Sequence, residues 1–524
     1  MWVKDIIKMK THKLFLIFSG LFLWFGFSSV SAQLLKNQQY NYLEQNFFTT
    51  QVFPDTFSYA YHFQKPRPWL AAAEVVGFNA GLHLFDRFVL KADYAQVTPK
   101  VIRHNLKHGF VWDNDNLSTN MFWHPFTGAL YFNSARTNGH NFWQSIPYAI
   151  FGSLIWECFG ESEPPSLNDL IATPIGGIAL GEITYRISHL VLDDSKQGLE
   201  RFGRELLGGI ISPMGLFNRM LNGDAWNYRP RTPYHFNSPY NHSPFIFNIS
   251  AASRFLEDMD GNKGSMNMAL CTEMIYGQPF INKNRKPYDF FTANIGMNVI
   301  GNQPLIYNVN VIGLIWGKEW KRNDNHWLAG VFQHFDFYDT DPIVAGGKRL
   351  YQFTETAAFG GGVLYKRHQE NNRLSSFSGA VYANLILLGA SETDYYFVDN
   401  RNYNLGNGYS VKLNGRLNIK KRWEILFGAN HYHIFTTKGY GNADWEVNGL
   451  PEDVDFHYAN VQGNKGNAFL SMINIGVGYQ ISKKMRISAD QRFFLRKSHY
   501  EYLPDVRSSS MENHIQLTYT IFNR

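Results

Sequence analysis

The sequence predicts an α plus transmembrane β-barrel protein, in which an N-terminal apolar helical domain is followed by a roughly 12-stranded antiparallel outer-membrane barrel. Three observations predict this fold: a secretory leader, a composition rich in aromatic residues and poor in charge, and an apolar period of two in the second half. Aromatic residues make up 16% and charged residues 18% of the 524 residues. Both values suit a chain with a surface that faces lipid.

The N-terminus predicts the compartment. Lysines precede an apolar run at residues 14–27, which ends in the small-residue sequence SSVSA. This order is typical of a secretory signal peptide that is cut after Ala32. The run is shorter than the ~20 residues needed to cross a bilayer, which disfavours an uncleaved anchor. Gln33 follows the expected cut in place of a cysteine, so a lipoprotein anchor is not expected.

The charge balance argues against nucleic acid as a partner. Residues 1–32 carry four lysines and one aspartate, so their removal lowers the formal charge from +6 to +3. This positive charge is too small to indicate a nucleic-acid-binding protein. The two cysteines, Cys158 and Cys271, fall in different predicted domains. A disulfide framework is therefore not expected.

From residue 245 onwards, apolar residues alternate with small or polar ones. In INIGVGYQIS, Ile473, Ile475 and Val477 alternate with Asn474 and Gly476. Such segments are expected at 245–256, 265–276, 288–301, 305–319, 326–338, 350–366, 375–390, 405–420, 423–437, 467–482, 485–500 and 511–522. Most are longer than soluble strands, which average about 5–6 residues. The length favours strands that cross a membrane, and a large soluble β-sandwich is the alternative.

The links between these segments predict the orientation. Short links at 420–422 and 482–484 follow even-numbered segments, and long links at 391–405 and 438–466 follow odd-numbered ones, although 301–304 is short where a long link is expected. Bacterial barrels have short periplasmic turns and longer outer loops. We therefore expect an outer-membrane protein with periplasmic termini, with outer-membrane lipid as a partner and the barrel assembly machinery as a partner during insertion.

The domain boundaries follow from these patterns. We expect a signal peptide at 1–32, an irregular segment at 33–67, a helical domain of unknown function at 68–240 and the barrel at 241–524. The helical domain opens with an apolar helix at 68–90, which Pro68 is suited to begin. Asn79, His83 and Asp86 lie three or four residues apart and form one polar stripe on this helix.

The next helices carry more polar residues than helix packing needs. The stretch FWHPFTGALYFNSARTNG places polar side chains among small residues, namely His124, Tyr131, Asn133, Arg136 and Asn138. Glu157 lies near the C-terminal end of a short apolar helix, 146–156, where the helix dipole disfavours an anion. His124 and Arg136 are the cations that we expect to pair with Glu157.

The sequence SLND follows Glu157 and has the form of a helix cap. Ser166 would cover backbone N–H groups and Asp169 would lie in the first turn. Pro174 interrupts the pattern and is expected to restart the helix. Gly177 and Gly181 then form a small-xxx-small face that allows close helix contact.

These residues define a hypothetical site. Four residues are catalytic candidates. His124 would act as base or acid, Arg136 would hold a phosphate or carboxylate, Glu157 would orient or protonate, and Asp169 would assist. The ligand-binding candidates are Tyr131, Asn133, Asn138, Ser166 and Glu182. Helix capping alone is an equal explanation for Ser166 and Asp169. His104 and His108 have the spacing of helical zinc ligands, but no glutamate stands between them. No metal and no cofactor are expected.

Residues 120–182 resemble a family of Gram-negative outer-membrane proteins defined by the domain of unknown function numbered 3943. The motifs HPFTGALYFNSAR, GSLIWE, PPSLNDLIATPIGG and LGE carry the resemblance, which covers roughly residues 75–190. It implies location and architecture and no activity. A looser pattern is similar to VanZ-like membrane proteins, with His124, Glu157, Ser166, Asp169 and Gly177 in the matching places; Pro125, directly after the histidine, departs from it. This second resemblance implies an amphiphilic envelope ligand.

Two functions from different classes remain open. The first is a non-enzymatic barrel whose helical domain, at or in the periplasmic mouth, binds a lipid or glycolipid or gates the lumen. The second is an enzyme that modifies envelope lipid or lipopolysaccharide with His124, Glu157 and Asp169, although no nucleophile motif such as G-x-S-x-G is present. A structural envelope protein is a third alternative. Whether the protein is an enzyme is left open by the sequence.

Overall fold

The computed structural model describes residues 65–523 except 113–116, 118, 229–243, 259, 281–284, 345–346, 369–373, 396–402, 421, 438 and 440–462. The predicted signal peptide and nearly all of the irregular segment lie outside these residues. The described residues divide into two compact units. One contains residues 184–228, and the other contains residues 65–183 together with the strands.

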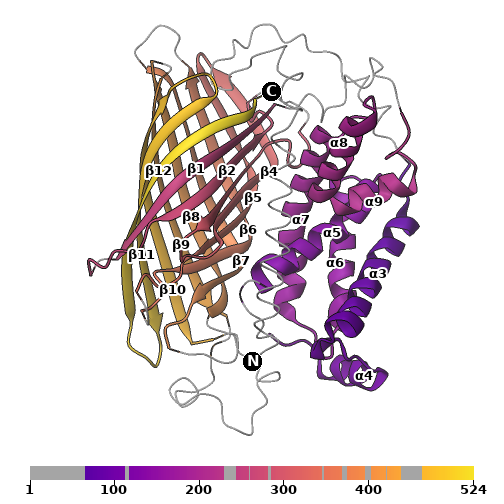
Figure 1. Ribbon diagram of the computed structural model, residues 1–524. Coiled ribbons are helices and arrows are strands. Elements are labelled where there is room, and N and C mark those ends of the chain that lie inside the picture. The colour runs from indigo at the N-terminus through magenta and orange to yellow at the C-terminus, as the bar shows by residue number, and fades with distance from the viewer. Residues whose placement is uncertain are drawn as a thin grey trace. The chain divides into compact units, whose positions relative to one another are not determined.

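Twelve strands form a closed antiparallel barrel in which every strand pairs with its neighbours in sequence and β1 pairs with β12 (Figure 1). The strands are β1 (Phe245–Asp258), β2 (Asn267–Tyr276), β3 (Phe291–Ile300), β4 (Ile306–Arg322), β5 (Asn325–Asp339), β6 (Gln352–His368), β7 (Leu374–Glu392), β8 (Tyr403–Ile419), β9 (Trp423–Thr436), β10 (Gly466–Gln480), β11 (Met485–Tyr500) and β12 (Val506–Asn523). The predicted strand number and fold class are confirmed.

The alternation within the strands separates two faces. On β10, Ile473, Ile475 and Val477 are 44–54% exposed, whereas Leu470 and Met472 are buried in the lumen. Closure leaves no free strand edge, so all ladder hydrogen bonds are satisfied without water. An exposed apolar outer face on such a barrel is the surface that meets lipid.

The predicted difference between the two rims holds with three exceptions: the links after β3 (301–305) and β11 (501–505) are short at the rim with the long loops, and the link after β2 is long at the other rim. The links after β4 (323–324), β8 (420–422) and β10 (481–484) are short, and the link after β9 (437–465) is long. The link after β2 (277–290) is also long, although it lies at the rim with the short turns. Both barrel ends lie at that same rim, because Phe247 of β1 pairs with Phe522 of β12.

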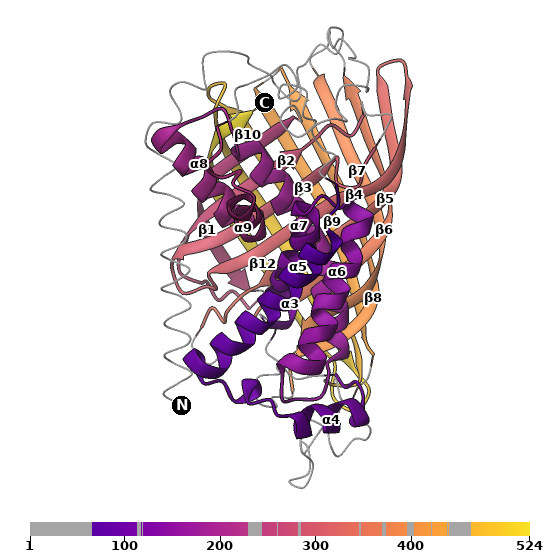
Figure 2. The ribbon, with the colours of Figure 1, turned by 90° about the vertical axis from the view of Figure 1, so that its right-hand side faces the viewer.

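Seven α-helices precede the barrel among the described residues. They are α3 (Pro68–Phe85), α4 (Pro99–His108), α5 (His124–Thr137), α6 (Phe142–Ile155), α7 (Leu167–Val191), α8 (Gly198–Ile211) and α9 (Pro213–Leu221), with π-helical turns η3 (Asp86–Leu90), η5 (Thr119–Trp123) and η6 (Trp156–Gly160) and the 3-10 turn η4 (Asp93–Ala95). Figure 2 shows α3, α5 and α6 side by side. None of the helices described is both long enough and apolar enough to cross a membrane.

The helices differ from the sequence expectation in two ways. α3 and α6 are apolar nearly all round, but α4, α8 and α9 are amphipathic, so the description of the whole domain as apolar is wrong. Pro174 lies inside the continuous helix α7, so the predicted restart is also wrong. The small-residue face is confirmed, because a Cβ on Gly177 would lie 2.4 Å from the backbone of Gly128 on α5. The two helices therefore touch backbone to backbone.

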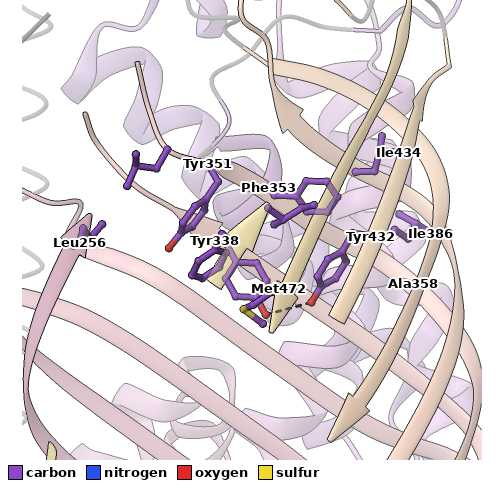
Figure 3. Packing of buried hydrophobic residues seen from close by; sticks show 12 residues of the cluster. Leu256, Tyr338, Tyr351, Phe353, Ala358, Ile386, Tyr432, Ile434 and Met472 are labelled. Atoms are coloured by element: carbon purple, nitrogen blue, oxygen red, sulfur yellow. Dashed lines mark hydrogen bonds between the residues drawn. The ribbon is translucent and has the colours of Figure 1, made fainter. Parts of the chain in front are cut away.

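The barrel lumen contains a packed apolar core (Figure 3). Its buried members come from strands around the barrel and from the link between β5 and β6: Leu256, Tyr338, Leu350, Tyr351, Phe353, Ala358, Ile386, Tyr432, Ile434, Leu470, Met472 and Phe494. The Tyr351 ring stacks on Phe494 with centroids 4.2 Å apart. We call these twelve residues the lumen cluster.

We predict that Gly128→Ala destabilises the helices, because the added Cβ would lie 1.8 Å from the carbonyl oxygen of Thr173. A forced backbone shift of this kind costs about 1–3 kcal/mol, which thermal unfolding followed by circular dichroism would measure. The control is Gly81→Ala on α3, where no atom lies within 4 Å of the new Cβ. There alanine should be neutral or stabilise by up to ~1 kcal/mol. Equal melting of the two variants would contradict the close crossing.

We predict that the wild-type barrel shows no steady current in planar lipid bilayers, because we expect the lumen cluster, whose members come from strands around the barrel, to block the flow of ions. The double variant Leu350→Ala and Tyr351→Ala removes the two cluster members supplied by the β5–β6 link and should produce resolved current steps. Ile475→Ala, on the outward face of β10, is the control and should remain silent. A steady open current in wild type would refute the blocked lumen.

Candidate functional site

Six of the nine predicted site residues lie in two separate groups within the helices. The first group surrounds His124 and Asp169, and the second surrounds Arg136 and Glu182. We call the first the His124 cluster, which consists of Asn120, His124, Glu157, Ser166, Asn168 and Asp169.

Glu157 has a local reason to stand at the end of its helix. Its Oε2 accepts a hydrogen bond of 2.8 Å from the backbone N–H of Ser166. The carboxylate is 2% exposed and lies in the π-helical turn η6 that ends α6. It therefore ties the end of α6 to the start of α7, which offsets the unfavourable dipole that the sequence indicated.

The predicted cap at the start of α7 is confirmed. The hydroxyl of Ser166 accepts a hydrogen bond of 3.3 Å from the backbone N–H of Asp169 and donates one of 2.8 Å to Oδ1 of Asn168. Asn168 in turn donates to Asn120 at 3.0 Å and to the Asp169 carboxylate at 3.2 Å. Neither asparagine was predicted, although Asn168 stands inside the quoted SLND motif.

His124 approaches the Asp169 carboxylate. Its Nε2 lies 3.5 Å from Oδ1 of Asp169, and the side chains are 13% and 1% exposed. His124 is the first residue of α5, where Pro125 occupies the first turn. The other five members of the cluster are at most 2% exposed. His124 is thus the member of the cluster that a solvent or lipid molecule can contact.

Exposed apolar residues surround this position in the chain. Trp123 and Phe126, on either side of His124, are 47% and 40% exposed. Phe159 in η6 and Leu167 at the start of α7 are also exposed. Since these residues flank His124, Glu157 and Ser166 in sequence, a polar cluster and an apolar surface share the same helix ends.

Arg136 does not join the His124 cluster through any contact described here. Its guanidinium donates to both Glu182 oxygens, at 2.7 Å and 3.0 Å, and to the carbonyl oxygen of His140 at 2.8 Å. Arg136 is 7% exposed and Glu182 is fully buried. The bidentate pair joins α5 to α7. Arg136 thus pairs with Glu182, whereas the sequence offered it as a partner of Glu157; its role as holder of a phosphate or carboxylate stays a prediction.

The remaining candidates are buried between helices. The Tyr131 hydroxyl donates to the Asn79 side chain, which itself donates to the carbonyl oxygen of Gly152 at 3.0 Å. Asn138 donates to the Glu74 carboxylate at 2.9 Å, and Asn133 is 1% exposed on α5. Glu74 was missed, although an acid in an apolar helix was a visible signal. These contacts are those of packed helices.

The unit of residues 184–228 contains an ion network that was not predicted. Arg219 lies 2.6 Å from Asp194 and 2.7 Å from Glu205, and Arg201 lies 3.0 Å from Asp194. Burial would lower the pKa of the Arg219 guanidinium, but its hydrogen bonds and attraction to Glu205 and Asp194 outweigh burial and raise it. The network joins α8 and α9 and is a structural one. Among the described residues, no three His, Cys, Asp or Glu side chains gather as around a metal ion.

The family model of a domain of unknown function (DUF3943) matches residues 109–214, which confirms the resemblance seen in the motifs. None of the curated proteins compared with the chain matches it. Among solved structures, the NanC porin matches at 10% identity, covering 51% of this chain and 98% of its own, with a TM-score of 0.24. The toluene transporter TodX of Pseudomonas putida matches at 8% identity, covering 53% and 89%, with a TM-score of 0.22.

The COG4313 outer membrane channel of Pseudomonas putida F1 matches at 8% identity, covering 53% of this chain and 95% of its own, with a TM-score of 0.26. At such identities and TM-scores the matches say nothing about ligand or activity. The class is defined by the barrel itself: it is closed, antiparallel and apolar on its exposed outer face. The protein is an outer-membrane β-barrel. Its helices contain a domain that is similar to the DUF3943 family.

We predict that Arg136→Met alone destabilises the helices by about 3–5 kcal/mol, because it leaves the Glu182 carboxylate buried without its arginine. The double variant Arg136→Met and Glu182→Met should recover most of that loss. Chemical unfolding in detergent, followed by circular dichroism, would measure both. The control is Lys196→Met, which removes a partly exposed pair with Glu200 and should cost at most about 1 kcal/mol. A double variant as unstable as the single one would contradict a closed pair.

Proposed function

We propose that the protein is a non-enzymatic outer-membrane barrel whose helical region binds an envelope amphiphile at the His124 cluster. The observation that supports this function is the position of His124, whose partly exposed imidazole lies 3.5 Å from the buried Asp169 carboxylate. Lumen gating, the other form of this function, is less favoured because buried apolar side chains from strands around the barrel pack together inside the lumen.

The chemistry of the cluster indicates which part of an amphiphile it would meet. The imidazole of His124 can donate a hydrogen bond from a ring nitrogen. Such a donor suits the oxygens of a phosphate or carboxylate headgroup. The exposed rings of Trp123 and Phe126 would contact the apolar part of the same molecule. An anionic lipid or glycolipid therefore fits both halves of the site.

An enzyme that modifies envelope lipid is the second candidate. The His124 and Asp169 pair has the arrangement of a general base and the acid that orients it. Glu157 accepts a hydrogen bond from Ser166, and Arg136 pairs with Glu182, which supports a role for these two in holding the helices together. The enzyme would depend on His124 and Asp169, with an attacking group supplied by the substrate or by water.

We predict that wild-type protein, extracted in mild detergent, retains an anionic lipid that mass spectrometry detects, and that His124→Ala retains about tenfold less or lower still. Losing one charge-assisted hydrogen bond costs about 1.5–3 kcal/mol, which corresponds to that change. His108→Ala removes an exposed imidazole elsewhere, at the end of α4, and is the matched control. Equal lipid retention in all three proteins would reject the binding site.

Lipid profiles of whole cells distinguish binding from catalysis. Outer-membrane lipids would be profiled in cells that lack the protein and in cells complemented with wild type, Glu157→Gln or His124→Ala at equal membrane levels. A binding protein leaves the chemical set of lipids unchanged. A lipid species that depends on wild type and is absent with His124→Ala would instead establish the enzyme. Loss in Glu157→Gln alone would indicate that the link between α6 and α7 shapes the site.

A further inference from the structure

One part of the barrel's outer face is buried. On β5, Val331 points outward and is 42% exposed, but Gln333, Phe335 and Phe337, which follow on the same face, are at most 7% exposed. The opposite face of β5 is the lumen side, because His334 contacts Lys412 of β8 there. Something therefore covers the outer wall at these positions.

Three contacts identify the cover as the helices of the same compact unit. The Gln333 side chain donates to the carbonyl oxygen of Ile175 on α7 at 2.7 Å. Thr356 of β6 donates to the sulfur of Met121 in η5 at 2.7 Å. Asn120, also in η5, donates to the hydroxyl of Tyr403 on β8 at 2.7 Å.

A fourth contact is made by aromatic rings. Phe142 at the start of α6 lies 5.9 Å from the ring of Tyr288, whose hydroxyl donates to the Gln333 side chain at 2.8 Å. Phe142, Tyr288 and Gln333 are all buried. Two helices, α6 and α7, therefore meet the wall around the same glutamine.

The position of Gln333 gives the depth of this contact. It lies near the middle of β5, which runs from Asn325 to Asp339. A strand of this length crosses the hydrocarbon layer, so its middle lies far from both rims. A helix that contacts Gln333 from outside is consequently at the depth of the lipid chains. A polar wall residue at this depth also needs a protein partner, because lipid offers none.

The helices also carry exposed apolar residues of their own. On α3 and η3 they include Val76, Leu84, Phe85, Phe88, Val89 and Leu90, and on α6 they include Trp143, Ile150, Phe151 and Leu154, each 41–66% exposed. Polar residues of the same helices, Asn79 and Ser153, are buried and bonded to other helices. The exposed apolar faces of α3 and α6 match the barrel's lipid-facing surface, of which Ile475 is 54% exposed.

We propose that α3, α5, α6 and the first half of α7 form a layer docked on the outer wall of the barrel within the bilayer, with the exposed faces of α3 and α6 against the lipid chains. The wall residues from Gln333 to Phe337 are then covered by protein, and the apolar helix faces take their place against lipid. This location on the outer wall differs from the location at or in the periplasmic mouth of the barrel that the sequence predicted for the helical domain. It holds whether or not His124 binds a ligand.

Spin labels at single cysteines test the lipid contact, in a background with Cys158→Ala and Cys271→Ala. Labels at Ile150 on α6, at Ile475 on β10 and at Asn323 in the β4–β5 turn would be compared in liposomes for collision with oxygen and with a water-soluble nickel complex. We expect Ile150 to match Ile475, with high oxygen and low nickel accessibility. Nickel accessibility at Ile150 equal to that at Asn323 would overturn the proposal.

Cross-linking tests the docking. Met121→Cys with Thr356→Cys should form a disulfide in isolated outer membranes, and Met121→Cys with Ile475→Cys should not. A folded barrel without the first disulfide would overturn the docking. If the first pair prevents folding, a photo-reactive phenylalanine at Phe142 replaces it and should attach to the peptide that contains Tyr288; attachment elsewhere would overturn the docking. Lipid retention by His124 is measured separately, so either proposal can fail alone.

Discussion

Closure of the sheet between β1 and β12 is the constraint on which the rest of the structure depends. Lipid cannot pair with a free strand edge, and each unsatisfied backbone group there costs several kcal/mol. The seam runs from Ile246 to Asp258 with one irregularity between Phe247 and Asn248, and inside the lumen the Ser250 hydroxyl lies 2.9 Å from that of Thr518. Once the sheet is closed, alternate residues must point to lipid or to the lumen. That alternation produces both the exposed apolar surface and the lumen cluster.

Burial places a similar demand on the polar side chains of the helices. Their polar side chains find partners on other helices: Arg136 on α5 with Glu182 on α7, and Glu157 in η6 with the backbone at Ser166. Such pairs fix which helices are neighbours, because a buried charge without its partner is strongly destabilising. The contact of Gly128 with Gly177 fixes how close two of them come. Polar pairs and small residues thus together determine how these helices pack.

Local patterns in the sequence predicted the strands, the Ser166 cap and the glycine face, because each depends on residues a few positions apart. Pairing across long separations could not be read in this way. Arg136 and Glu182 are 46 residues apart, and the sequence offered Glu157 as the partner of Arg136 instead. The lumen cluster was missed because alternation separates two faces of a strand but does not show which side chains, such as Tyr338 and Tyr432, meet across the barrel.

The distribution of charge explains why function is best sought at His124. In the lumen, Lys412 lies 2.6 Å from Asp336 and 3.0 Å from Glu355. Between the helices, the guanidinium group of Arg136 donates hydrogen bonds to both carboxylate oxygens of Glu182. In both places the opposite charges lie within hydrogen-bond distance in closed surroundings, so they have little to offer a ligand. His124 differs because its acid partner is buried while its own ring reaches the surface beside exposed aromatic residues. A ligand that brings a negative charge and an apolar chain would complete that arrangement.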